Sequence, residues 1–191
     1  MSKWLRTDEA EEAIAALESF VGFLRDTEED VLNWRWAIIS LHIATQGFMV
    51  VALRDSAGLT PLRDDVASEW LRAYRAGEKL PKEKLDSYRG LYKKVKRKQI
   101  AAQLQAEPFQ PKGRQGESIL RLCDFRDRFI HFVPSSWSLE VDGLPRICGD
   151  VLGFVDYLAH RYRWIIWHEE NQPTRIKAAL SYARVHIDRC S

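Results

Sequence analysis

The most apolar stretch of the chain, residues 34–53, places the strongest constraint on the fold. It is about as long as a membrane span, but four polar residues interrupt it: Arg35, His42, Thr45 and Gln46. Such side chains are costly in lipid. The stretch is therefore interpreted as a buried central helix, and no membrane association is expected.

Amphipathic helical patterns lie on both sides of this stretch. Thr7 fits an N-cap, acidic residues fill the turns after it, and apolar residues recur at helical spacing to about residue 26. A short acidic turn at Thr27 then leads into the long helix. Residues 7–58 are thus predicted to form an antiparallel helical hairpin. Later helices are predicted at about 116–132, 150–167 and 173–189.

Residues 59–114 have a different character, because prolines and glycines divide them into short helices at about 63–76 and 82–98. We interpret them as a basic insertion in a single domain, residues 1–191, whose core helices lie at about 7–58 and 115–189. Residues 72–114 hold thirteen Lys and Arg against four Asp and Glu, whereas residues 1–30 hold three against nine. The small net charge of +2 therefore combines an acidic N-terminal segment with a basic middle segment.

A small β-hairpin is predicted after the helix at about 116–132. Residues 137–141 alternate between apolar and polar, Asp142-Gly143 is a typical turn pair, and residues 144–148 fit a returning strand. The predicted fold is otherwise all-α.

Composition excludes several classes of protein. With 46% hydrophobic and 29% charged residues, the chain can fill a core, which excludes disordered, collagen-like and disulfide-scaffold proteins. The three cysteines are an odd number without CxxC spacing, and no signal-type segment precedes the first charged residues. These features predict a reducing, cytoplasmic location.

The clearest chemical signal lies at the end of the predicted helix 116–132, where Arg126 and Asp127 are followed four residues later by His131. At 100° per residue, Asp127 and His131 lie about 40° apart on adjacent turns, so their side chains are expected to touch. The long side chain of Arg126 reaches round toward the same cleft. We therefore expect the three groups to converge on one anion.

These residue types suit metal-independent cleavage of RNA. Arg126 is the candidate phosphate clamp, since a guanidinium stays charged and offers a fork of donors. His131 is the candidate general acid or base, and Asp127 is expected to orient it. The 2′-hydroxyl then attacks the adjacent phosphate, and no cofactor or metal site is required. The alternative is a solvated salt bridge at a helix C-terminus, because such spacing also arises by chance.

Residues 126–131, Arg-Asp-Arg-Phe-Ile-His, resemble the signature of the HEPN superfamily (higher eukaryotes and prokaryotes nucleotide-binding): an Arg, then Asn, Asp or His, three variable residues and a His. The apolar helix around residues 34–42 is also similar, and most of the chain resembles bacterial HEPN-like proteins, some plasmid-borne. The resemblance implies an up-and-down helical bundle that forms a homodimer, with the two motifs facing a shared cleft. It also implies ribonuclease activity in toxin–antitoxin or other defence systems.

The match carries over to individual residues. Arg126 and His131 occupy the two functional positions, and Asp127 occupies the variable polar position, where Asp places a negative charge beside the expected phosphate. Some HEPN proteins are inactive modules, so the alternative is a non-catalytic domain that binds RNA, a nucleotide or a protein partner such as an antitoxin.

A second candidate RNA-binding element is basic. Five residues compose it: Lys93, Lys94, Lys96, Arg97 and Lys98. Tyr88 and Tyr92 lie nearby, so the segment is predicted to follow an RNA backbone and stack a base. Its alternative is a solvated helix face.

The remaining histidines give weaker signals. His42, in the apolar stretch, either faces the cleft of the motif or is a satisfied polar group in the core, and the second interpretation is the more common. His160 and His168 are eight residues apart, which is too far for a helical zinc pair, so no metal is expected.

Overall fold

The structure is a computed structural model that describes residues 3–131, 134 and 136–189. Within these residues it is all-helical, and its β contacts are limited to an isolated bridge between Leu62 and Leu85. The all-α prediction is confirmed. The helices are α1 (Glu9–Asp26), α2 (Asn33–Leu53), α3 (Asp64–Ala76), α4 (Tyr88–Lys96), α5 (Lys98–Gln103), α6 (Gln115–Ile130), α7 (Leu144–His160) and α8 (Gln172–Arg189).

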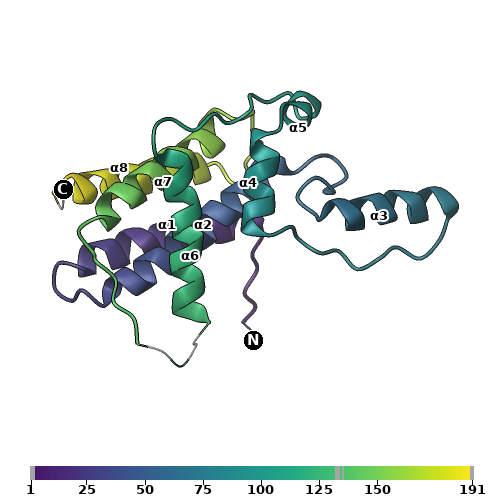
Figure 1. Cartoon of the computed structure of the whole chain (residues 1–191). Coiled ribbons are helices and arrows are strands. Elements are labelled where there is room, and N and C mark those ends of the chain that lie inside the picture. Colours follow the sequence, from purple (N-terminus) through teal and green to yellow (C-terminus); the bar gives the residue numbers. More distant parts are fainter. Residues whose placement is uncertain (1–2, 132–133, 135, 190–191) are drawn as a thin grey trace.

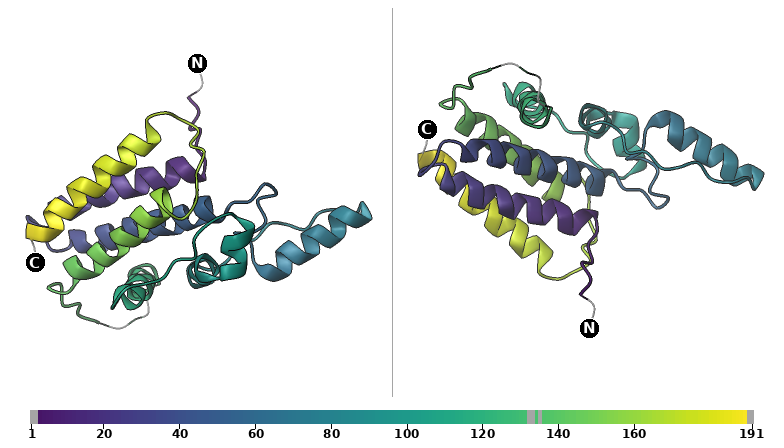
Figure 2. Two further views of the ribbon diagram at one scale, coloured as in Figure 1. Left: turned by 90° about the horizontal axis from the view of Figure 1, so that it is seen from above. Right: turned by 90° about the horizontal axis from the view of Figure 1, so that it is seen from below.

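Four long helices, α1, α2, α7 and α8, lie side by side, and α6 crosses them, so that Figure 2 shows α6 nearly end-on. Helix α2 is central, because it contacts α1, α4, α6 and α7, and twelve of its 21 residues are buried. Among the described helices α2 alone is long and apolar enough to span a membrane, yet 67% of its most apolar stretch is buried within the protein. The prediction of a buried central helix is confirmed.

The hairpin of α1 and α2 forms as expected, with a different cap. The carboxylate of Asp8, rather than the hydroxyl of Thr7, accepts hydrogen bonds from the backbone N–H groups of Ala10 and Glu11, at 3.0 and 2.8 Å. The two helices approach closely at Gly47, where an added Cβ would lie only 2.7 Å from the Cβ of Ala13. A glycine is therefore required at this crossing.

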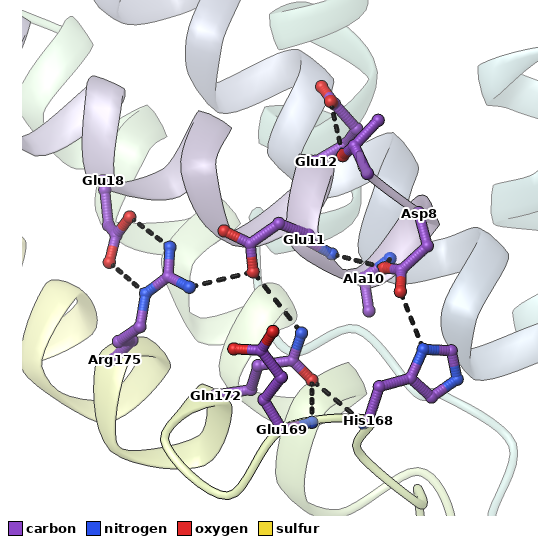
Figure 3. Close-up of polar contacts among 10 residues, drawn as sticks. Asp8, Ala10, Glu11, Glu12, Glu18, His168, Glu169, Gln172 and Arg175 are labelled. Carbon is purple, nitrogen blue, oxygen red and sulfur yellow. Dashed lines mark hydrogen bonds and ion pairs between the residues drawn. The ribbon is translucent and has the colours of Figure 1, made fainter. Parts of the chain in front are cut away.

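A polar network joins α8 and the loop before it to the acidic N-terminal region (Figure 3). Arg175 forms two hydrogen bonds to Glu18, at 2.8 and 2.7 Å, and one to Glu11 at 2.9 Å. The Nδ1 atom of His168 lies 2.7 Å from Asp8. The hydrogen bonds from Arg175 hold the pKa of Glu18 below its usual value. Arg175 near the C-terminus thus neutralises part of the acidic N-terminal segment.

The predicted β-hairpin is wrong, because residues 144–148 form the first turns of α7. Pro145 occupies the first turn of a helix, where its missing N–H costs nothing, and Leu144, Ile147 and Cys148 are buried at helical spacing. Residues 137–141 form no strand either. Helix α7 also ends at His160, earlier than the predicted residue 167, and Trp164 beyond it is exposed.

The segment 59–114 divides into two parts. Helix α3 projects away from the body of the molecule (Figure 1), and its base is held by a small apolar cluster of Leu59, Leu62 and Val66. In contrast, α4 packs against α2 and contributes Leu91 to the main core. The expected helix at 82–98 is shorter, because α4 begins only after the N-cap Ser87. This segment is therefore partly projecting arm and partly core.

Candidate functional site

The candidate site lies at the C-terminal end of α6, where Arg126 and Asp127 occupy the last turns. The helix ends at Ile130, and His131 has left the helical conformation (φ −97°, ψ 92°), although its N–H still bonds to the carbonyl of Asp127 at 2.9 Å. The side chain of His131 is exposed. The backbone thus presents His131 to solvent at the tip of the helix.

The guanidinium of Arg126 is held from two sides. Its Nε donates to Nδ1 of His42 on α2 at 3.3 Å, and its Nη1 donates to Oδ1 of Asp127 at 2.8 Å. The Arg126 side chain is 26% exposed, so one part of it still faces solvent. A guanidinium fixed in this way is a preorganised donor for an anion that approaches from outside.

His42 is fully buried, and its ring stacks on Tyr88 of α4 with 4.4 Å between ring centroids. Burial, assisted by the positive charge of Arg126, lowers the pKa of His42 to about 3. The imidazole is therefore neutral at ordinary pH, as it must be for Nδ1 to accept from Arg126. His42 is a core residue that also contacts the motif through Arg126. It is not a satisfied polar group in the core, because its buried Nε2 has no hydrogen-bond partner among the described residues.

The expected contact between Asp127 and His131 does not form. Among the described residues, no hydrogen bond or ion pair joins the His131 side chain to Asp127 or Arg126. Asp127 instead binds Arg126, and its Oδ2 atom lies 4.0 Å from Sγ of Cys123. The reason is that α6 ends before His131, so the helical spacing behind the expectation does not apply there. The structure brings Arg126 and Asp127 together and leaves His131 separate.

The thiol of Cys123 next to this pair is largely buried. Burial, followed by the negative charge of Asp127, raises the pKa of Cys123 above its usual value. The group therefore remains a neutral thiol and is not an activated nucleophile.

The predicted basic element does not act as one surface, because Lys94 is buried. Its ammonium group lies 2.8 Å from Asp64 and 3.2 Å from Asp86, and it donates to the carbonyls of Thr60 and Leu62. Lys94 thus anchors the base of the projecting arm to α4. It is removed from the set of candidate RNA contacts.

The other four bases of this segment are exposed. The positive charge of Arg97 is partly neutralised by Asp64, whose carboxylate lies 3.4 Å from Nη1 of Arg97. Lys96 lies over the ring of Tyr92, 4.3 Å from its centroid. Lys93, Lys96 and Lys98 therefore remain as the candidate RNA-binding positions.

Neither tyrosine of this segment can stack a nucleobase in this structure. Tyr88 and Tyr92 are 5% and 1% exposed. The ring of Tyr88 lies against His42, and Tyr92 packs edge-on against Phe154 of α7 with 5.6 Å between centroids. The two rings belong to the core, contrary to the prediction.

No metal site is found in the described part of the chain, where no three His, Cys, Asp or Glu side chains gather closely enough to hold an ion. No protein-family model, curated protein or solved structure matches the chain. The functional assignment therefore depends on the geometry of the site and on the resemblance of its motif.

Proposed function

We propose that the protein is a metal-independent endoribonuclease of the HEPN type, located in the cytoplasm. The observation that supports this most directly is the guanidinium of Arg126, which is oriented by His42 and Asp127 and still open to solvent. His131 stands exposed at the end of the same helix. One group suits phosphate binding and the other suits proton transfer.

The proposed reaction is transesterification within one RNA strand. The 2′-oxygen forms a bond to the adjacent phosphorus, the bond from phosphorus to the 5′-oxygen breaks, and a 2′,3′-cyclic phosphate results. An imidazole of His131 accepts the 2′-hydroxyl proton, and an imidazolium gives a proton to the leaving 5′-oxygen. Arg126 stabilises the negative charge that develops on the phosphate oxygens.

This reaction is best served by a homodimer, because two copies of His131 supply both the base and the acid. Two exposed apolar residues on α2 support such an assembly: Trp36 and Ile43. Their spacing of seven residues puts them on one side of the helix. A dimer through this side is measurable by light scattering, and a strict monomer at high micromolar concentration would count against a composite site.

One observation favours the second candidate function, a non-catalytic module that binds RNA, a nucleotide or an antitoxin-like protein. The carboxylate of Asp127 already occupies Nη1 of Arg126 and competes with a phosphate for it. The variant Asp127→Asn separates the two functions. It removes the negative charge that competes with a phosphate, so an endoribonuclease is expected to bind RNA more tightly and to retain cleavage, whereas the binding module is expected to bind RNA more tightly without cleaving it.

The test of the proposed function is cleavage of labelled tRNA and total RNA in EDTA. Wild-type protein is expected to leave cyclic-phosphate ends, while Arg126→Ala and His131→Ala are expected to be inactive. Arg75→Ala, on the projecting helix α3, is the control for removal of an exposed arginine. If purified wild-type dimer leaves RNA intact, the binding module replaces the nuclease as the proposed function.

A further inference from the structure

A pocket of about 360 Å³ lies beside the end of α6, between it, the start of α2 and the segment that precedes α7. Three aromatic side chains form much of its wall: Trp34, Phe129 and Trp137. Arg35 and Arg128 also line it. The guanidinium of Arg35 lies over the ring of Trp36, outside the lining, 4.8 Å from its centroid. The remaining lining is aliphatic, so the pocket is apolar with two positive groups.

The aromatic rings of the pocket are arranged around an open site. Phe129 and Trp137 lie 5.0 Å apart between centroids at 54°, and the guanidinium of Arg128 lies 5.7 Å from the Trp137 ring. That guanidinium lies over the ring, and Trp137 is 37% exposed, so part of the residue remains open to solvent. Aromatic rings and guanidinium planes are the groups on which nucleobases stack.

The charges of the pocket are positive and uncompensated. No carboxylate is among its lining residues. Within the described chain, neither Arg35 nor Arg128 forms an ion pair, whereas Arg126 and Arg175 both do. A ligand for this pocket therefore combines a planar aromatic ring with a negative charge, which is the chemistry of a nucleotide.

The pocket shares helices α6 and α2 with the candidate site, although Arg126, Asp127 and His131 do not line it. Phe129 in its wall lies two residues before His131. Arg35 and His42 are seven residues apart on α2, which puts them on one side of the helix and about 10 Å apart along its axis. His42, which orients the Arg126 guanidinium, thus lies on the same side of α2 as Arg35 of the pocket.

We infer that this pocket binds the base of an RNA nucleotide next to the phosphate held by Arg126, an inference that rests on the proposed function. The base stacks on Trp137, and Arg128 and Arg35 bind the phosphate attached to that nucleotide. The pocket thereby positions the strand, and the residues that form it determine which nucleotide is preferred at the cleavage site.

The experiment follows the indole N–H signals of the tryptophans by NMR in the full-length protein. The probes are 3′-AMP, 3′-UMP and a short RNA whose reactive 2′-hydroxyl is replaced by hydrogen. The signal of Trp137, assigned with Trp137→Phe, is expected to shift with the short RNA, while that of the distant and exposed Trp164 remains unchanged. Adenosine or inorganic phosphate alone is expected to bind more weakly than 3′-AMP.

Two variants measure the contribution of the pocket. Trp137→Leu removes the stacking face, and Arg128→Gln removes a surface charge with little effect on folding. Each is expected to weaken binding of the short RNA at least about fivefold, because a stacked base and a charged hydrogen bond to a phosphate each commonly contribute this much. Arg75→Gln is the matched control. If Trp137→Leu does not fold, Arg128→Gln still decides the question.

The outcomes distinguish this inference from the proposed function. If the short RNA leaves the Trp137 signal unchanged, or if only free mononucleotides shift it, the inference is wrong. If RNA shifts the signal and Arg128→Gln weakens binding, the inference holds, whether or not wild-type protein cleaves RNA. Arg126→Ala is expected to abolish cleavage while the 3′-AMP shift at Trp137 persists, because that group lies outside the pocket lining.

Discussion

Protonation of His42 is predicted to make the folded state unstable in acid, and His42→Asn is predicted to remove this effect. The side-chain oxygen of the introduced asparagine can replace Nδ1 as the acceptor for Arg126, but an amide does not titrate. Two groups contact the buried imidazole from neighbouring elements: Arg126 on α6 and Tyr88 on α4. Neither can stabilise an imidazolium by a negative charge.

The magnitude follows from the difference in pKa between the two states. An unfolded His42 titrates near 6.5 and the folded one at about 3. Because the folded pKa is lowered, the contribution to stability is complete above pH 6.5 and is lost as the pH falls toward 3. At pH 5 the loss is about 2 kcal/mol, from 1.5 pH units at about 1.36 kcal/mol each.

Urea unfolding at intervals between pH 5 and pH 7.5 measures this loss. The wild-type free energy of unfolding is expected to fall by about 2 kcal/mol more than that of His42→Asn over this range. Other titrating groups contribute equally to both proteins and cancel in the difference. Parallel curves for the two proteins would refute the reasoning, as would an NMR titration in which the His42 ring protonates above pH 5.

Three further predictions concern the stability of the fold. Lys94→Ala is expected to lower the free energy of unfolding by about 2 kcal/mol in urea titrations, because it leaves buried carbonyl groups without their donor. Gly47→Ala is expected to lower the melting temperature, because its Cβ would lie 2.7 Å from that of Ala13. Gly22→Ala has open space around the added Cβ. It is therefore expected to raise the melting temperature through a gain of up to about 1 kcal/mol in helix propensity. Arg175→Ala is expected to cost about 1 kcal/mol at low salt and less at high salt, since its ion pairs with α1 are partly exposed; equal losses at both salt concentrations would contradict an electrostatic role.

Periodicity in the sequence was sufficient to predict most of the helices, because each amphipathic pattern depends on neighbours within one segment. The β-hairpin prediction failed at residues 144–148, where a pattern of five residues fits both a strand and the first turns of a helix. Pro145 and the apolar residues that continue the helical spacing through Val151 decide for the helix. The longer pattern was the better guide, since the strand interpretation used only a short window.

Burial of the charged and aromatic groups in the segment 88–98 could not be predicted from composition. A run of lysines gives the same local signal on a solvated face and on a face that packs. Lys94 is buried where Asp64 and Asp86, from other parts of residues 59–114, approach its ammonium together with two backbone carbonyls. Only the path of the chain through the projecting arm brings these groups to one place.

The geometry of the candidate site could also not be predicted from the sequence alone. Arg126, Asp127 and His131 are visible in the sequence as a local motif, but their expected geometry assumed a helix that continues through His131. Helix α6 ends one residue earlier, and Asp127 pairs with Arg126, whose other partner, His42, lies 84 residues away in the sequence. A lone histidine in an apolar helix was the one available signal for that partner. The orientation of the guanidinium is therefore a product of the crossing of α6 over α2, so substitutions in the core of that crossing are coupled to the chemistry of the motif.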